Sequence, residues 1–300
     1  MKMNNILKTT ALLLGSSVLL SGCIKETFPE SGYATSDQTA ESPFAKEGLI
    51  TAMPTVLITN YTDLGEHIDF GYPGIFGATD RMVGEVFPVS GNLPGGNQYY
   101  DRWQAWLYPG NSTGLAANGW ASPFFYTNYY KFIFTANEAI DIANQSEGAE
   151  EMMGIAKTFR ALCYLDLARL YDALPAKAPE RPAYETELEA VKGLTVPIVR
   201  EDTSMEELEN NPRVSREEMF KFIFEDLNTA ETLLANYTPA TKNLPSLAVI
   251  YGLKARAYLW LGGFDSSKYA DAATYARKAI DASKCTIMTE AEWLNPKTGF

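Results

Sequence analysis

Residues 156–175 constrain the fold more than any other stretch, because their pattern predicts a helix that is apolar on two sides and ends before a proline. One face is lined at steps of three or four by Met152, Ala156, Phe159, Cys163, Leu167 and Leu170. Leu162 and Leu165 add a second apolar strip beside that face. Such a helix has to be covered on two sides. We therefore predict an interior element of a helical stack, packed against the segments just before and after it.

The same helix carries three charged residues. Lys157, Arg160 and Asp166 interrupt the apolar pattern, and we attribute them to solvation and to pairing between helices. We do not expect a ligand site on this helix.

The composition indicates a folded chain with no polyanionic partner. Of the 300 residues, 46% are hydrophobic, which is enough for a packed core. The formal net charge is −12, and no Lys/Arg cluster interrupts it. Because a nucleic-acid backbone would be repelled, we expect no nucleic-acid partner.

Residues 1–22 have the pattern of an export signal. A positive start with Lys2 and Lys8 precedes an apolar run that is too short to span a bilayer, and Leu20-Ser21-Gly22-Cys23 closes it. This ending resembles a bacterial lipobox, which implies cleavage after Gly22 and lipid chains such as palmitate on Cys23. The alternative is an ordinary secretory signal with an incidental cysteine. On the lipobox reading, the protein is anchored to a membrane by lipid and does not span it.

Two further cysteines, Cys163 and Cys285, are expected to be inert, buried thiols. Their spacing leaves open whether they form a disulfide.

We divide the mature chain into a flexible tether and a helical domain. Residues 23–45 are polar and lack periodicity, as in a tether, and residues 46–300 form the domain. A first helix is expected around residues 46–60, broken by Pro54. Residues 65–121 are so rich in Gly and Pro that we predict a long structured loop region, and its many aromatic residues argue against disorder.

Two helical hairpins are predicted, over residues 123–174 and 215–282. The first has a tight turn at residues 146–148, and its Asn137 is expected to face a neighbouring backbone or solvent, with a structural role favoured. The second opens with a capping box formed by Ser215 and Glu218. Its last two helices, 246–261 and 268–282, resemble a tetratricopeptide-type pair. In the final helix we expect these residues to point inward: Tyr269, Ala272, Ala276 and Ile280.

The sequence offers little catalytic chemistry. His67 is the one histidine, and we find neither a zinc spacing nor a P-loop nor a Gly-x-Ser-x-Gly motif. We therefore expect no metal, no cofactor and no enzymatic activity. Glycosidic chemistry by paired carboxylates is a remaining alternative, with these acids as candidates: Asp63, Asp69, Asp80 and Glu85.

The positive signal is an aromatic cluster in the loop region. Trp103 and Trp106 lie three residues apart, so they fall on one side of a helical turn. Aromatic rings stack on the C–H faces of sugars, while neighbouring polar groups bind the hydroxyls. The predicted ligand platform adds Asn97, Tyr99, Tyr100, Asp101 and Arg102. The alternative is that these rings form the core beneath the loop, and packing is favoured for Trp120 and residues 124–130.

Several segments together resemble the SusD/RagB family. They are the lipobox, residues 129–144 with Ala136-Asn137, residues 156–174, the loop end Asn211-Pro212-Arg213-Val214-Ser215, Glu225-Asp226-Leu227 and the closing Ala-rich helix pair. The resemblance implies a surface lipoprotein of a Bacteroidetes-type outer membrane. It also implies a nutrient-binding protein that covers a TonB-dependent transporter of the SusC type. Family members usually continue well beyond a residue equivalent to Phe300, so we expect a fragment or an early stop.

The sequence thus predicts a mostly α, tetratricopeptide-like scaffold that binds a glycan or similar nutrient for a SusC-like transporter. A helical-repeat adaptor for a protein or peptide is the second hypothesis, and a surface glycoside hydrolase is the third. The identity of the ligand stays open.

Overall fold

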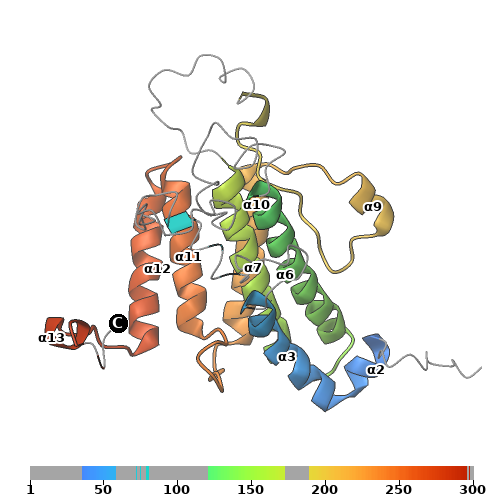
Figure 1. Cartoon of the computed structure of the whole chain (residues 1–300), viewed down its shortest axis with the longest axis horizontal. Helices are drawn as coiled ribbons and strands as arrows, with labels where there is room; N and C mark the ends of the chain where they lie inside the picture. Colours follow the sequence, from blue (N-terminus) through green and yellow to red (C-terminus); the bar gives the residue numbers. More distant parts are fainter. Residues whose placement is uncertain are drawn as a thin grey trace, which may run out of the picture.

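The computed structural model describes residues 36–58, 72, 75, 79–80, 121–172, 189–295 and 297. Within them the helices are α2 (Ser36–Glu41), α3 (Pro43–Ile58), α6 (Ala121–Asn144), α7 (Glu150–Tyr171), α9 (Met205–Glu209), α10 (Arg216–Leu233), α11 (Leu247–Gly262), α12 (Lys268–Ser283) and α13 (Glu290–Trp293) (Figure 1). The described residues form no strand, only an antiparallel bridge between Leu194 and Ser215. The prediction of a mostly α fold is confirmed.

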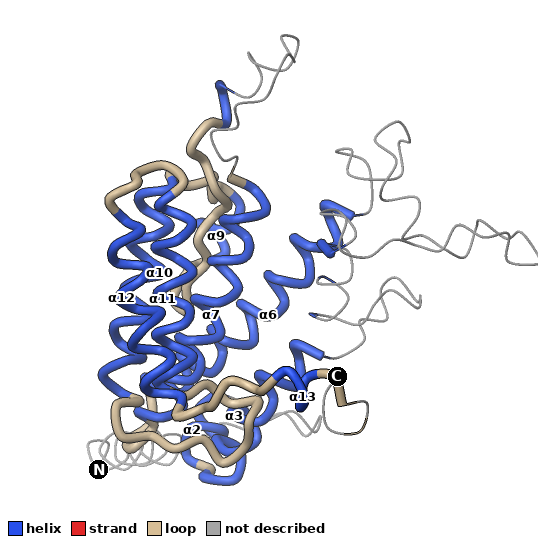
Figure 2. Tube along the Cα trace, turned by 90° about the vertical axis from the view of Figure 1, so that its left-hand side faces the viewer, coloured by secondary structure: helices blue, strands red, loops and turns tan. Residues whose placement is uncertain are grey.

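Helix α7 is the central element of the stack. It packs against α6 on one side and α10 on the other, with α3 and α11 as further neighbours (Figures 1 and 2). Ile155, Leu165 and Leu167 on α7 are fully buried. Of the predicted apolar face, Met152, Ala156 and Cys163 are also buried, and Phe159 and Leu170 are partly so. The expected interior helix is therefore confirmed.

A short turn joins α6 to α7 and makes the first hairpin. Gly148 adopts a positive φ of 68°, which a residue without Cβ reaches at no steric cost. The Ser146 hydroxyl donates to Ile142 O at 2.8 Å, and so satisfies a carbonyl of the last turn of α6. These local bonds reverse the chain and let the two helices lie side by side.

Helix α10 begins where the sequence predicts, but with a simpler cap. The Ser215 hydroxyl accepts from Glu218 N at 3.1 Å, while the return contact from the Glu218 side chain is not formed. The backbone around Ser215 is already engaged, because it bridges to Leu194 and Arg216 N donates to Gly193 O at 2.8 Å. One face of α10 is fully buried, from Met219 through Ile223, Leu227 and Ala230 to Leu234.

The final pair, α11 and α12, forms the predicted hairpin, but the inward face of α12 differs from expectation. Ala272 is buried, whereas Tyr269 and Ile280 are about half exposed at 47% and 53% and Ala276 is exposed. The reason is that α12 packs mainly on α11 and so buries only a narrow stripe. Gly262 permits the close approach, because a Cβ there would lie 2.4 Å from the Tyr269 ring.

The start of the domain also differs from expectation. Helices α2 and α3 occupy residues 36–58, so the end of the predicted tether is helical, and α3 continues through Pro54. Tertiary packing overrides the break, because Met53 and Leu57 are buried in the common core. The Thr55 hydroxyl donates to Thr51 O at 2.9 Å, one helical turn back along α3. No described helix combines the length and apolarity that a membrane span requires.

Candidate functional site

The predicted ligand platform, residues 97 and 99–103 with Trp106, lies outside the described residues, as do Trp120 and the lipidation candidate Cys23. Two members of the long aromatic loop region are described with packing contacts. Ile75 is buried, and Tyr72 reaches α7. These contacts place part of the loop region against the helical stack.

A strap formed by residues 194–201 crosses the α6–α7 hairpin. The Tyr164 hydroxyl accepts from Val199 N at 2.7 Å and donates to Val199 O at 3.1 Å. The Asn137 amide donates to the same carbonyl at 3.1 Å, and the Tyr130 hydroxyl donates to Pro197 O at 2.5 Å. The structural role favoured for Asn137 is confirmed. Side chains on two helices thus replace the pairing that a β-sheet would give this backbone.

Arg160 ties the strap to three helices. Its guanidinium binds Asp226 of α10 with two bonds, Nε to Oδ2 at 2.7 Å and Nη2 to Oδ1 at 2.9 Å. It also donates to Asn137 Oδ1 at 2.8 Å and to the Glu201 carboxylate. Lys157 adds a 3.0 Å contact to Asp226. Although burial favours protonation of Glu201, the cationic Arg160 lowers the pKa of this carboxyl below its ordinary value.

The attribution of Arg160 and Asp166 to solvation is wrong, while their pairing between helices is confirmed. Arg160 has no exposed surface and Asp166 only 6%. Arg160 and Asp166 lie between apolar residues of α7 in the sequence. Because a charged side chain among buried residues needs a partner of opposite charge, this position indicated a buried ion pair. Their partners lie 66 and 90 residues away, at Asp226 and Arg256, so the sequence alone did not identify them.

Asp166 is the centre of a second cluster, at the end of α7. Its Oδ2 accepts from the hydroxyls of Tyr72 at 2.7 Å and Tyr129 at 3.2 Å. Its Oδ1 accepts from Arg256 Nη2 of α11 at 2.7 Å and from Arg169 Nη1 at 3.3 Å. Burial, and then the charge of Asp166, raise the pKa of both tyrosines well above the ordinary value. The phenols therefore stay protonated and act as donors.

A cavity of about 360 Å³ lies beside this cluster. It is lined by Arg169 from α7, by one face of α11 and by Tyr269 from the first turn of α12. The α11 face follows the helical steps i, i+3, i+4 and i+7 with Arg256, Leu259, Trp260 and Gly263. Trp260 Nε1 is buried there and has no hydrogen-bond partner in the part of the chain that the structure describes.

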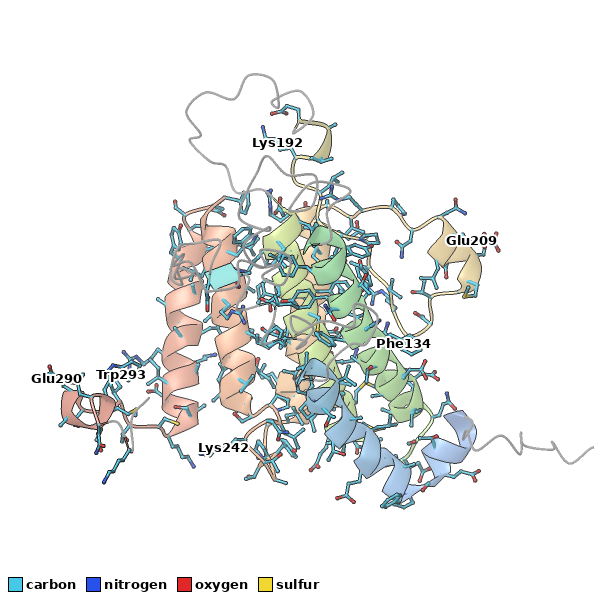
Figure 3. All side chains as sticks on the ribbon, in the orientation of Figure 1. Phe134, Lys192, Glu209, Lys242, Glu290 and Trp293 are labelled. Atoms are coloured by element: carbon cyan, nitrogen blue, oxygen red, sulfur yellow. The ribbon has the colours of Figure 1, made fainter. Side chains whose placement is uncertain are left out.

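A second cavity, of about 580 Å³, lies between the strap and α9 and is more polar. Its lining includes Arg200, Glu206 and Asn210. Helix α9 stands away from the helical stack, with Glu209 at its end (Figure 3).

The described residues contain no group of three or more His, Cys, Asp or Glu side chains that could hold a metal ion. Of the four acids considered for glycosidic chemistry, Asp80 alone is described, and it is partly buried. Cys163 and Cys285 are both free, so the disulfide left open by their spacing is not formed. Burial raises the pKa of the Cys163 thiol, as expected for an inert cysteine, whereas Cys285 is exposed, contrary to expectation.

Comparison with known families identifies the scaffold. The model of a SusD-like family, described as starch-binding and associating with the outer membrane, matches residues 96–259, which is more than half of the chain. The chain belongs to this SusD-like family. The matched interval contains all of the predicted platform, from Asn97 to Trp106, together with every charged residue of the two clusters on α7.

Solved structures agree with this membership at the level of the fold. A SusD-like carbohydrate-binding protein from Bacteroides vulgatus is 21% identical, with a TM-score of 0.61 over 83% of this chain and 46% of its own. A SusD homologue from Bacteroides thetaiotaomicron is 15% identical, with a TM-score of 0.58 over 87% of this chain and 45% of its own. The SusD-like chain therefore spans less than half the length of these proteins. No curated protein matches it.

Proposed function

We propose that this SusD-like protein is a cell-surface lipoprotein that binds a glycan or similar nutrient and delivers it to a SusC-like TonB-dependent transporter in the outer membrane. Membership of the SusD-like family carries the proposal, because the family is described as starch-binding and associating with the outer membrane. The aromatic platform predicted from Tyr99, Trp103 and Trp106 lies within the matched interval and suits the flat faces of sugars. Anchoring is through lipid on Cys23.

We further propose that the protein binds its ligand without catalysis. Three buried carboxylates support this view, because each is held in an ion pair: Asp166 with Arg256, Asp172 with Arg216 and Asp226 with Arg160. The bonded guanidinium occupies oxygens of each carboxylate and fixes its position. These groups fit structural roles.

An adaptor for a protein or peptide is the second candidate. It is favoured by exposed apolar side chains on the terminal hairpin, where Val249, Leu259 and Ile280 are 44%, 58% and 53% exposed. Such residues on a tetratricopeptide-like pair are typical of interaction surfaces. The glycan proposal accounts for the family match directly, and the adaptor does not.

Glycan binding can be tested with a soluble form of the full chain that carries Cys23→Ala. Against a panel of polysaccharides and oligosaccharides we expect measurable binding, weakened roughly tenfold by Trp103→Ala or by Trp106→Ala, since each removes a stacking ring. Isothermal titration calorimetry measures the effect. Trp293→Ala, which removes a 54% exposed ring on α13, is the matched control and should bind normally. Absence of binding to every glycan in the panel would favour the adaptor.

Anchoring has a separate test in cells. The wild-type chain should fractionate with membranes and be digested by protease added to intact cells, and Cys23→Ala should move to the soluble fraction. Immunoblotting of fractions from cells of a Bacteroides species reads the result. Membrane retention of Cys23→Ala with surface protease access would contradict the lipid anchor. Copurification of a TonB-dependent transporter with the wild-type chain tests the proposed partner.

A further inference from the structure

The described wall of the cavity between α7, α11 and α12 carries excess positive charge. Arg169 and Arg256 both line it, and both donate to one carboxylate, that of Asp166. None of the residues that line the cavity in the described part of the chain is acidic. Two guanidinium groups balanced by one carboxylate leave one positive charge. The two side chains keep 45% and 37% of their surface exposed, so they can still reach a ligand.

The two arginines also keep spare hydrogen-bond donors. A guanidinium has five N–H groups in a planar fork that suits carboxylate and sulfate oxygens. Among the described residues, Arg169 and Arg256 each donate one hydrogen bond, to Asp166 Oδ1. Asp166 is 6% exposed and holds both groups at the cavity wall. The arginines are thus oriented before a ligand arrives.

Trp260 supplies an independent sign of a missing partner. Its Nε1 is buried and finds no hydrogen-bond acceptor among the described residues, although the residue lines the cavity. A buried N–H group without an acceptor is destabilising, so most are paired in folded proteins. Nε1 itself has no accessible surface, so an acceptor oxygen on a bound molecule reaches it only when the indole turns toward the cavity.

The other side chains in the described part of the lining are two aromatic rings and a leucine. The Trp260 ring, the Tyr269 ring and Leu259 form this part of the wall, and the Tyr269 ring is set close to α11 by Gly262. The volume of about 360 Å³ falls in the range of small-molecule sites, which is about 300–1,000 Å³. Rings of this kind pack against the C–H face of a sugar.

We propose that this cavity binds a negatively charged sugar residue, a uronate or a sulfate ester, within the captured glycan. Arg169 and Arg256 bind the anionic group, Trp260 Nε1 donates to a ring or hydroxyl oxygen, and Tyr269 packs against the sugar face. The inference deepens the proposed glycan-binding function and rests on it. It makes the cavity a subsite for acidic glycans, separate in the sequence from the platform around Trp103.

The test uses the soluble full chain and three probes: a galacturonate trisaccharide, a κ-carrageenan tetrasaccharide, which carries sulfate and no uronate, and neutral maltotriose. We expect tighter binding of at least one acidic probe than of maltotriose. For that probe, Arg169→Gln should weaken binding about tenfold and Trp260→Phe about fivefold, the losses of a charge-assisted and a neutral hydrogen bond. Trp260→Phe keeps a ring, and Arg169→Gln leaves Asp166 bonded to Arg256, so both variants should fold.

Lys242→Gln is the matched charge control, because Lys242 is exposed and lies at the opposite end of α11 (Figure 3). It should bind the acidic probe as the wild type does. The Trp260 indole N–H resonance gives a direct readout. It is assigned as the peak missing from Trp260→Phe, and it should shift when the acidic probe is added.

The outcomes separate this inference from the proposed function. Binding of maltotriose alone, or acidic binding that Arg169→Gln and Trp260→Phe leave unchanged, overturns the acidic subsite while glycan capture stands. Binding of only the uronate or only the sulfate supports the subsite and identifies its anionic group. Absence of binding to the three probes and to the wider glycan panel overturns both proposals.

Discussion

Replacement of Arg160 by methionine is expected to lower the free energy of unfolding by about 3–5 kcal/mol, the cost of breaking a buried ion pair. Arg160 is fully buried and binds Asp226, Asn137 and Glu201. Methionine fills similar space but offers no donor, so Asp226 keeps Lys157 as its remaining cationic partner. Urea denaturation followed by circular dichroism measures the loss.

Two further variants test whether the loss in Arg160→Met comes from the buried ion pair. Lys192→Met breaks an exposed pair with Glu189 and should cost less than about 1 kcal/mol. Arg160→Met combined with Asp226→Leu removes both fully buried charges and should recover part of the loss, because Lys157 and Glu201, which lose these partners, keep 17% and 19% of their side-chain surface exposed. A loss for Arg160→Met no larger than that for Lys192→Met would contradict the assignment.

The Arg160 variant should also change the pH dependence of stability. Arg160 lowers the pKa of Glu201 in the folded state. A carboxyl with a lowered folded pKa stabilises the protein above its unfolded pKa, near 4.5 for glutamate, and the contribution disappears as pH falls through the folded pKa. The stability of Arg160→Met should therefore decline less steeply below pH 4.5 than that of the wild type.

Leu165→Ala is expected to destabilise the protein by about 2–5 kcal/mol, because it removes buried methyl groups and leaves a cavity in the centre of the stack. Leu165 on α7 has no exposed surface and belongs to the common core of helices α3, α6, α7, α10 and α11. Denaturant unfolding measures the change as a lower midpoint.

Leu162→Ala is the matched control, since Leu162 lies on the same helix and is only partly buried. The same methyl groups are removed from a site that water already reaches, so its loss should be less than half as large. Equal losses at the two positions would contradict the central placement of α7.

The periodic helices were predictable from the sequence. Helices α6, α7, α10, α11 and α12 lie where the apolar steps place them, and the apolar face of α10 from Met219 to Leu234 is fully buried. The start of a helix was also predictable, because it depends on nearby residues. Ser215 caps α10 because an N-cap bond joins residues three apart, and such a bond depends on local sequence.

Predictions that depended on distant packing were less accurate. Pro54 predicted a break in α3, yet burial of Met53 and Leu57 keeps the helix intact. Tyr269 and Ile280 were expected to point inward, but in the described structure α12 packs mainly on α11. In both cases the outcome depends on which helices pack against the segment. Those helices come from elsewhere in the chain, so the local pattern does not identify them.

The sequence by itself determined the class of scaffold, its hairpins and the family resemblance, because helical period and turn chemistry act over a few residues. Tertiary structure alone decided which charges on α7 are buried. Arg160 meets Asp226, and Asp166 meets Tyr72 and Arg256, across 66 to 94 residues of sequence. The cavity beside Asp166 arises in the same way, since α7, α11 and α12 each provide part of its wall. A charged residue in a buried apolar stripe indicates that a partner of opposite charge exists. Only folding brings that partner within hydrogen-bonding distance.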